Sequence, residues 1–143
     1  MGTSDRNIRK RINKNSPKSN AIRHKGYFKF PAVMLNAQDF YTLSPAAIKL
    51  LVDIGAQYNG YNNGDLHCAR SILKKRNWTS NSQLSKAKKE LLEKEWIVET
   101  KAGGFGIGPS LYAITWQPVD DCNGKHSLRP TTTPLRSFKE EQP

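Results

Sequence analysis

The chain has 143 residues, 36% of them hydrophobic, and a formal net charge of +11. This length allows one domain with polar ends, and the chain lacks the run of roughly eighteen apolar residues that spans a bilayer, so we expect no membrane contact. Because there are only two cysteines and no apolar signal segment at the N-terminus, we expect a cytoplasmic protein, associated with the nucleoid if it is bacterial.

The positive charge is concentrated at the N-terminus. Residues 1–25 carry eight Lys or Arg against one Asp, residues 26–118 carry eleven against seven, and residues 119–143 carry four against four. A basic block of this kind favours a polyanionic partner, and its polar composition predicts a disordered arm. The arm is either a non-specific tether or a DNA contact on phosphates or in a minor groove. Its candidate contacts are Arg6, Arg9, Lys10, Arg11 and Lys14.

The core begins after this arm. Pro31 and the lack of a clean hydrophobic period obscure residues 26–44, where we predict a short strand followed by one or two helical turns. Ser44 followed by Pro45 indicates a helix start, and apolar residues then recur at helical spacing to about Tyr58. The turn sequence NGYNNGD ends this helix, and a very short strand is predicted at residue 66.

Two further helices follow. The segment CARSILKK predicts a helix of about two turns, and Thr79 or Ser80 is positioned to cap a third helix. Spacing residues about 100° apart along the third helix places Leu84, Ala87 and Leu91 on one face. The opposite face then carries Ser82, Lys86, Lys89 and Glu93, flanked by Gln83 and Ser85.

A hairpin and a polar tail complete the chain. WIVETK and LYAITW predict two strands joined by the uncharged turn AGGFGIGPS, in which Phe105 and Ile107 either fold back on the core or meet a partner chain. Residues 119–143 combine proline, threonine and mixed charge, so we predict a disordered polar tail, with a partner-binding role left open. Three tryptophans are expected in the core: Trp78, Trp96 and Trp116.

The order helix, short strand, helix, turn, helix, strand, loop, strand resembles a winged helix-turn-helix over roughly residues 27–117. NGYNNGDL, SKAKKELLEKEWIVET and LYAITW are similar to segments of helix-turn-helix proteins of phages, plasmids and integrated elements, including replisome organisers and plasmid replication proteins. The resemblance implies an α+β domain over residues 26–118, with a three-helix core and a C-terminal β-hairpin wing. One departure is Glu95, where such proteins usually have glycine in a left-handed turn.

The third helix is the predicted DNA contact. A recognition helix needs a buried face that sets its angle and an exposed polar and basic face that enters the major groove, and the spacing provides both. The alternative is an ordinary surface helix that carries Lys and Glu without binding anything. The predicted contacts are Ser80, Asn81, Ser82, Gln83, Ser85, Lys86 and Lys89, together with Lys101, the cation nearest the wing turn.

We therefore expect binding of double-stranded DNA by a protein that is not an enzyme. The sequence contains no nucleotide-binding loop, metal motif or nucleophile arrangement, so we predict no catalysis, cofactor or metal. The resemblance implies transcription regulation or initiation of DNA replication in a phage or mobile element. Whether the chain is a homodimer is left open. The alternative function is a protein-interaction module, such as a phage-encoded inhibitor or assembly factor, that holds a protein partner through its termini or wing.

Overall fold

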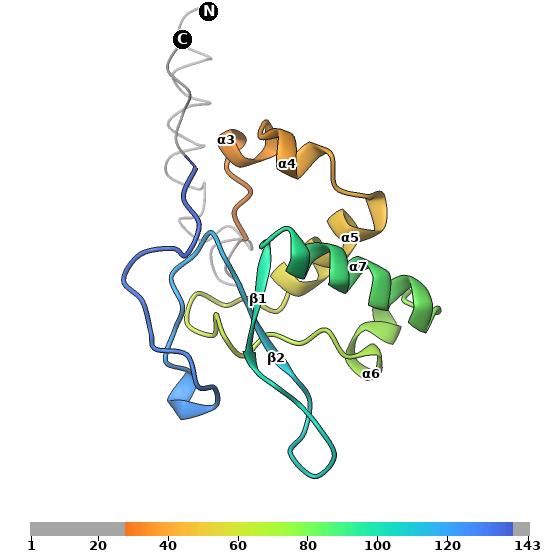
Figure 1. Cartoon of the computed structure of the whole chain (residues 1–143), viewed down its shortest axis with the longest axis vertical. Coiled ribbons are helices and arrows are strands. Elements are labelled where there is room, and N and C mark those ends of the chain that lie inside the picture. The colour runs from red at the N-terminus through yellow and green to blue at the C-terminus, as the bar shows by residue number, and fades with distance from the viewer. Residues whose placement is uncertain (1–27, 139–143) are drawn as a thin grey trace, which may run out of the picture.

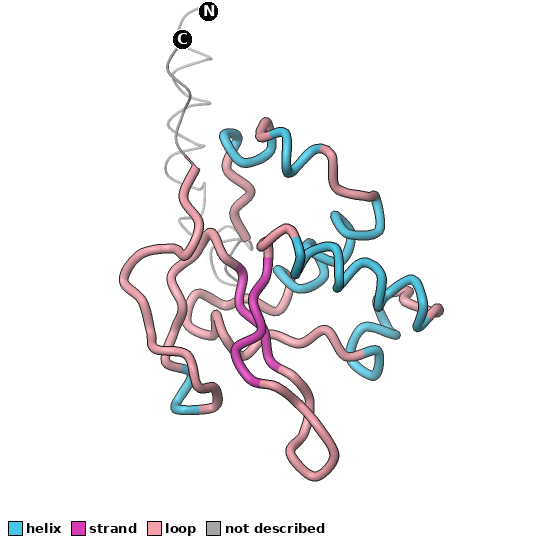
Figure 2. The backbone as a smooth tube through the Cα atoms, viewed as in Figure 1, coloured by secondary structure: helices cyan, strands magenta, loops and turns pink. Residues whose placement is uncertain are grey.

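The computed structural model describes residues 28–138 and has an α+β architecture of short helices and one two-stranded antiparallel sheet (Figure 1). The longest loops of this part of the chain lie before α6 and after β2 (Figure 2). The elements in chain order are α3 (Ala32–Leu35), α4 (Gln38–Tyr41), α5 (Pro45–Gly55), α6 (Arg70–Leu73), the 3-10 turn η1 (Lys74–Arg76), α7 (Asn81–Glu93), β1 (Ile97–Lys101), β2 (Leu111–Ile114) and the 3-10 turn η2 (Cys122–Gly124).

The segment before α5 contains two single-turn helices, and residues 28–43 include no strand. The predicted helical turns are confirmed, whereas the predicted short strand is wrong. Phe28 and Phe30 turn their rings toward Trp116, at centroid distances of 5.5 and 6.0 Å. These rings are covered by aromatic packing on the core, so the segment does not need a neighbouring strand to shelter its apolar side chains.

Helix α5 begins where the sequence predicts. The Ser44 hydroxyl accepts a hydrogen bond from the Ala47 N–H (3.1 Å), which satisfies one of the free donors of the first turn. The helix ends at Gly55, earlier than expected, because the N–H groups of Gln57 and Tyr58 bond to carbonyls three residues back. The last predicted turn is therefore tighter than an α-helix.

Helix α7 packs on α5 through the face that the spacing predicts. Leu84, Ala87 and Leu91 are buried, which confirms the expected inward side. Ser80 is the cap, since its hydroxyl accepts a hydrogen bond from the Gln83 N–H (3.2 Å). The local signals of cap and apolar spacing thus place this helix correctly.

Glu95 ends α7 in the left-handed conformation, with a φ of 60°. The Trp96 N–H donates to the Leu91 carbonyl (2.9 Å) and the Glu95 N–H donates to the Leu92 carbonyl (3.2 Å), which is the Schellman pattern of helix termination. Glycine is the residue that takes this conformation without a Cβ clash. The chain therefore turns from α7 into β1 through a strained glutamate.

Replacing Glu95 by glycine should stabilise the fold by about 1 kcal/mol, because the strain of the positive φ is removed. Urea unfolding followed by circular dichroism measures the change in free energy of unfolding. Lys94→Gly is the matched control, since Lys94 has a φ of −90° and gains nothing from glycine. A Glu95→Gly protein that is no more stable than the parent would contradict the proposed strain.

The two strands form a narrow sheet that a third segment joins at one residue. Ile97 of β1 lies opposite Ile114 of β2, and the register shifts just before Lys101, which marks a bulge. On the other edge of β2, Leu66 and Tyr112 exchange two backbone hydrogen bonds of 2.8 and 3.1 Å. The predicted very short strand is confirmed as this single bridge.

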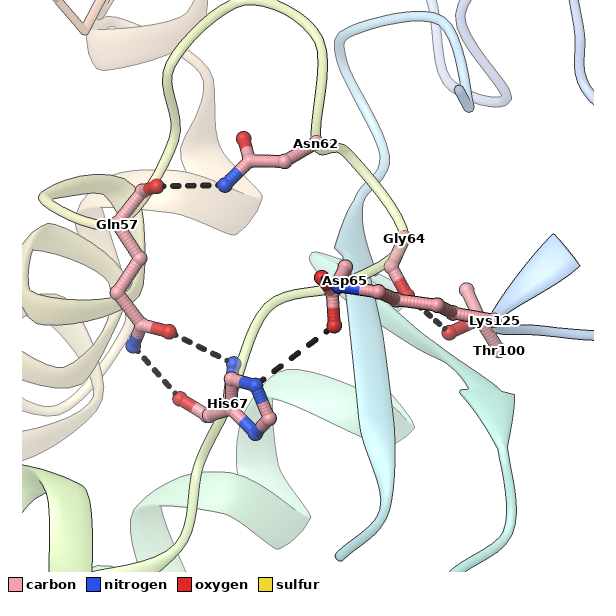
Figure 3. A network of polar contacts seen from close by, with 7 residues as sticks. All are labelled: Gln57, Asn62, Gly64, Asp65, His67, Thr100 and Lys125. Carbon is pink, nitrogen blue, oxygen red and sulfur yellow. Dashed lines mark hydrogen bonds and ion pairs between the residues drawn. The ribbon is translucent and has the colours of Figure 1, made fainter. Parts of the chain in front are cut away.

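The loop between α5 and α6 is tied down by polar contacts (Figure 3). The Gln57 side chain exchanges two hydrogen bonds with the backbone of His67, at 2.8 and 2.9 Å. The Thr100 hydroxyl of β1 donates to the Gly64 carbonyl (2.6 Å). These contacts fix the course of the loop that leads from α5 to α6.

Residues 119–138, which we call the strap, follow a defined path on the side of the sheet away from α6 and reach the C-terminal end of α7 (Figures 1 and 2). Val119 is buried, and it exchanges two hydrogen bonds of 2.9 Å with Thr131. Lys125 pairs with Asp65 at 2.9 Å (Figure 3). The sequence predicts a disordered tail here, and the structure instead packs the strap on the domain, because its few anchoring residues find partners far away in the chain.

Arg136 and Phe138 form the principal anchor of the strap. The Arg136 guanidinium lies 4.0 Å from the centroid of the Trp96 ring, on which the Phe138 ring stacks at 5.5 Å. The same guanidinium donates to the Lys94 carbonyl (2.8 Å) and forms an ion pair with Asp39. Burial lowers the pKa of Arg136, which stays charged at any physiological pH.

All three tryptophans lie in the core, as predicted. Trp96 is fully buried, and Trp78 and Trp116 are 3% and 5% exposed. Among residues 28–138, every helix is too short or too polar to cross a lipid bilayer.

Candidate functional site

A strongly basic segment runs from α6 into α7. Residues 69–89 contain seven Lys or Arg and no Asp or Glu, whereas residues 90–99 contain one Lys and four Glu. We call residues 69–89 the basic helix pair; it comprises α6, η1, the turn at residues 77–80 and most of α7 (Figure 1). The charge along the chain therefore changes sign within α7, between Lys89 and Glu90.

The turn between these helices is anchored to α5 by Asp53, which is 4% exposed. Its Oδ2 accepts hydrogen bonds from Lys49 Nζ and from the Trp78 indole N–H, both 2.6 Å long, and its Oδ1 accepts one from Arg76 Nε (2.8 Å). Burial raises the pKa of this carboxyl, but the hydrogen bonds from Lys49, Trp78 and Arg76 outweigh burial, so the pKa lies below its ordinary 3.8. A charged carboxylate therefore joins α5, η1 and the turn.

The turn itself is closed by local geometry. Asn77 has a φ of 69°, the left-handed conformation that Asn tolerates better than most side chains. Arg70 Nη2 donates to the Thr79 carbonyl (3.0 Å), which ties the start of α6 to the residue before the α7 cap. These contacts bring the two helices of the basic helix pair side by side at the turn.

The other end of α7 is held by Glu90. Its Oε2 accepts hydrogen bonds from the Ser44 N–H (2.9 Å) and the Ser44 hydroxyl (3.1 Å), so the carboxylate lies at the positive end of α5. The sequence predicts that Glu90 lies near the C-terminal end of α7. It does not predict the contact with Ser44, because the two residues are 46 positions apart in the chain. Glu90 and Asp53 together fix the angle of α7 against α5.

The predicted contacts on α7 share one exposed side. Ser80 is the exception, because it is half-buried while its hydroxyl caps the helix. Lys89 lies 3.8 Å from Glu93, and both side chains are more than half exposed, so this ion pair is weak and leaves the ammonium accessible. The exposed residues are Asn81, Ser82, Gln83, Ser85, Lys86 and Lys89.

Two cations outside the predicted set belong to the same surface. Lys74 and Lys75 are exposed on η1, directly before the turn into α7. The signal in the sequence is the run KKR at residues 74–76, which sits next to the predicted cap of the third helix. Together with the cations of α7 they place exposed positive charge on both sides of the turn at residues 77–80.

The remaining predicted contacts lie outside the basic helix pair. Lys101 is half-buried at the end of β1, where the hairpin leaves the sheet. Phe105 and Ile107 do not fold back on the core, since they are 107% and 60% exposed. The predicted arm contacts lie outside the described residues: Arg6, Arg9, Lys10, Arg11 and Lys14.

A groove of about 530 Å³ lies between the strap and the sheet. Two of its lining residues are glutamates and most of the others are apolar, so it does not suit a phosphate backbone. Its lining residues are Leu92, Glu95, Ile97, Val98, Glu99, Thr115, Leu135 and Arg136.

The described residues offer no cluster for a metal. Within residues 28–138, no three His, Cys, Asp or Glu side chains lie where they could hold a metal ion together. Burial raises the pKa of the Cys68 thiol to about 12, so it stays protonated at neutral pH and behaves as a small apolar core group.

No family model, curated protein or solved structure matches this chain. The functional assignment therefore rests on the basic helix pair. Its exposed amide, hydroxyl and ammonium groups are hydrogen-bond donors of the kinds that bind phosphate oxygens and base edges.

Proposed function

We propose that this chain binds double-stranded DNA, with α7 as the recognition helix of a winged helix-turn-helix and the β1–β2 hairpin as the wing. The observation that supports this most is the basic helix pair, which carries seven cations and no acid over residues 69–89. Its charge lies on a helix whose buried face is fixed to α5, so the exposed face has one orientation. A rigid polar and basic helix of this kind suits the major groove.

Helix α7 enters the groove with its N-terminal half. Asn81, Ser82 and Ser85 are small and let the backbone approach the bases, while Gln83 has the amide that pairs with adenine through two hydrogen bonds. Lys86 reaches either guanine or a phosphate. The unbonded N–H groups at the start of α7 add a site for a phosphate.

The role of this binding follows from the resemblance stated above. Occupancy of an operator or an origin either blocks or recruits other machinery, so the proposed roles are transcription regulation and replication initiation in a phage or mobile element. Lys74 and Lys75 contact phosphates beside the groove, and the basic arm adds further phosphate contacts. Each such contact releases counterions, so affinity falls steeply as salt rises.

Removing two cations from α7 tests the proposal. The full chain and its Lys86→Ala/Lys89→Ala variant are titrated against a pool of short random duplexes at several salt concentrations, and the retained duplexes are sequenced. The full chain should retain a recurring motif. The variant should bind more weakly, and the slope of log affinity against log salt should fall by about 2, since one counterion is released per phosphate contact.

The matched control is Lys125→Ala/Arg129→Ala, which removes the same charge from two exposed positions of the strap, outside the basic helix pair. It should leave the motif and most of the salt slope unchanged. If the α7 variant and the strap variant bind equally well, α7 is not the DNA contact. A protein without duplex binding under any condition would favour the protein-interaction module instead.

A further inference from the structure

The tip of the β1–β2 hairpin presents one aromatic side chain to solvent. No charged residue occurs from Ala102 to Ser110, and Phe105 is 107% exposed, the highest value among the large apolar residues of the described chain. Figure 1 shows the hairpin loop reaching past α6, clear of the rest of the domain. A phenyl ring left in water contributes nothing to stability by burial, and within residues 28–138 no part of the fold covers it.

The tip is narrow and has a defined shape. Gly104 and Gly108 form a backbone bridge of 3.0 and 3.2 Å hydrogen bonds, and the Ile107 N–H also donates to the Gly104 carbonyl (3.1 Å). Gly103 donates to the Ser110 hydroxyl (2.8 Å), and a Cβ at Gly103 would lie 2.3 Å from the Ser110 nitrogen. At Gly103 the two sides of the loop therefore lie so close together that only glycine, which has no Cβ, fits there.

The two apolar side chains of the tip have different surroundings. The Ile107 side chain lies over Gly104, since its Cδ1 is 3.8 Å from where a Cβ on Gly104 would be. Gly106, beside Phe105, has nothing within 4 Å of that position. Ile107 thus partly covers the loop backbone, and Phe105 is the side chain that projects.

A projecting phenyl ring on an uncharged loop has a narrow range of partners on DNA. It gains nothing from phosphates, which select cations, but it gains from the faces of bases, on which aromatic side chains stack. Proteins that insert apolar side chains between base pairs unstack one step and bend the duplex.

We propose that Phe105 inserts between two base pairs of the duplex that α7 reads, and that this insertion bends the DNA. The inference rests on the proposed DNA-binding function. The steps it selects are pyrimidine–purine steps such as TA and CA, because these unstack most easily. The preference for such a step then arises because its DNA deforms easily, and it needs no hydrogen bond between the protein and the bases.

The test uses the full chain and a duplex from the selection above, with 2-aminopurine placed in turn along the flank of the motif and fluorophores at the two ends. Binding should raise 2-aminopurine emission at one step and bring the ends closer. Phe105→Ala should abolish both signals and weaken binding about tenfold, as expected for loss of one aromatic stacked on a base. Phe105→Trp should restore them.

Two controls separate this inference from others. Tyr61→Ala removes another exposed aromatic, 83% exposed in the loop before α6, and should change nothing. If Phe105→Ala leaves both signals intact while Lys86→Ala/Lys89→Ala still weakens binding, the insertion is overturned and the proposed function stands. If Phe105→Ala instead dissociates an oligomer in sedimentation, the tip binds protein and the insertion is likewise overturned.

Discussion

Replacing Asp53 by alanine is expected to lower the free energy of unfolding by about 3 kcal/mol, because a buried carboxylate that joins three donors is lost. The Trp78 indole N–H then has no acceptor at a site where the ring is 3% exposed. Loss of the carboxylate affects Lys49 and Arg76 less, since their side chains are 44% and 43% exposed and can form hydrogen bonds with water instead. Urea unfolding of both proteins at neutral pH measures the difference.

The Asp53 carboxylate should also make the free energy of unfolding depend on pH in the acid range. Its pKa in the folded state lies below 3.8, so its contribution is present above that value and is lost as the pH falls through the folded-state pKa. The Asp53→Ala protein should therefore lose less stability than the parent as the pH is lowered from 5 to 2. Asp121→Ala is the control, because Asp121 is exposed and its removal changes charge alone. Parallel stability curves for parent and Asp53→Ala would contradict the role of the charge.

Loosening the turn should also affect the proposed DNA contact. Asp53 sets where the turn lies on α5, and α7 starts directly after that turn. If α7 reads bases, Asp53→Ala should weaken specific binding more than non-specific binding, because a misplaced helix still offers its cations to phosphates. The ratio of the two affinities, measured below the unfolding transition, reports this loss.

The parts of the fold that the sequence predicts well depend on neighbouring residues. Ser44 and Ser80 cap helices from within a few positions, and the three apolar residues of α7 follow a helical spacing that requires no knowledge of their partners. The exposed face of α7 follows from the same spacing, so the sequence also predicts most of the candidate site. Lys74 and Lys75 lie outside the predicted set because they belong to the short turn before α7, where helical spacing gives no clear exposed face.

The parts that the sequence does not predict depend on distant partners. Asp53 looks like one of several scattered acids until Arg76 and Trp78, 23 and 25 residues later, are brought to it by the turn. Glu90 similarly finds Ser44 across 46 residues. Phe28 and Phe30 alternate as a strand would, yet they are partly covered by the Trp116 ring, which lies more than 80 residues later in the chain. Composition and hydrophobic periodicity describe single residues and their neighbours, so they do not predict which distant side chains will meet.

Ending the chain at Pro118, the boundary that the sequence predicts, is expected to lower stability by at least as much as Asp53→Ala. The truncation removes Val119, which is 1% exposed and contributes about 1.5–3 kcal/mol by burial. It also uncovers the Trp96 ring on which Arg136 and Phe138 lie. A total of about 4 kcal/mol is a large part of the stability of an ordinary domain, and it corresponds to a melting temperature lower by roughly 15 °C.

The matched control ends the chain at Phe138 and keeps the whole strap. It should melt within about 2 °C of the full chain, since the described contacts are intact. Arg136→Ala should fall between the two truncations, with a loss of about 2 kcal/mol, because it removes the stacked guanidinium but leaves Val119 buried. Exposure of Trp96 in the shorter chain should shift its fluorescence to longer wavelength. Equal melting temperatures for the chains ending at residues 118 and 138 would show that the strap adds nothing to the core. That result would restore residue 118 as the end of the domain and leave the strap as a surface segment available to a partner.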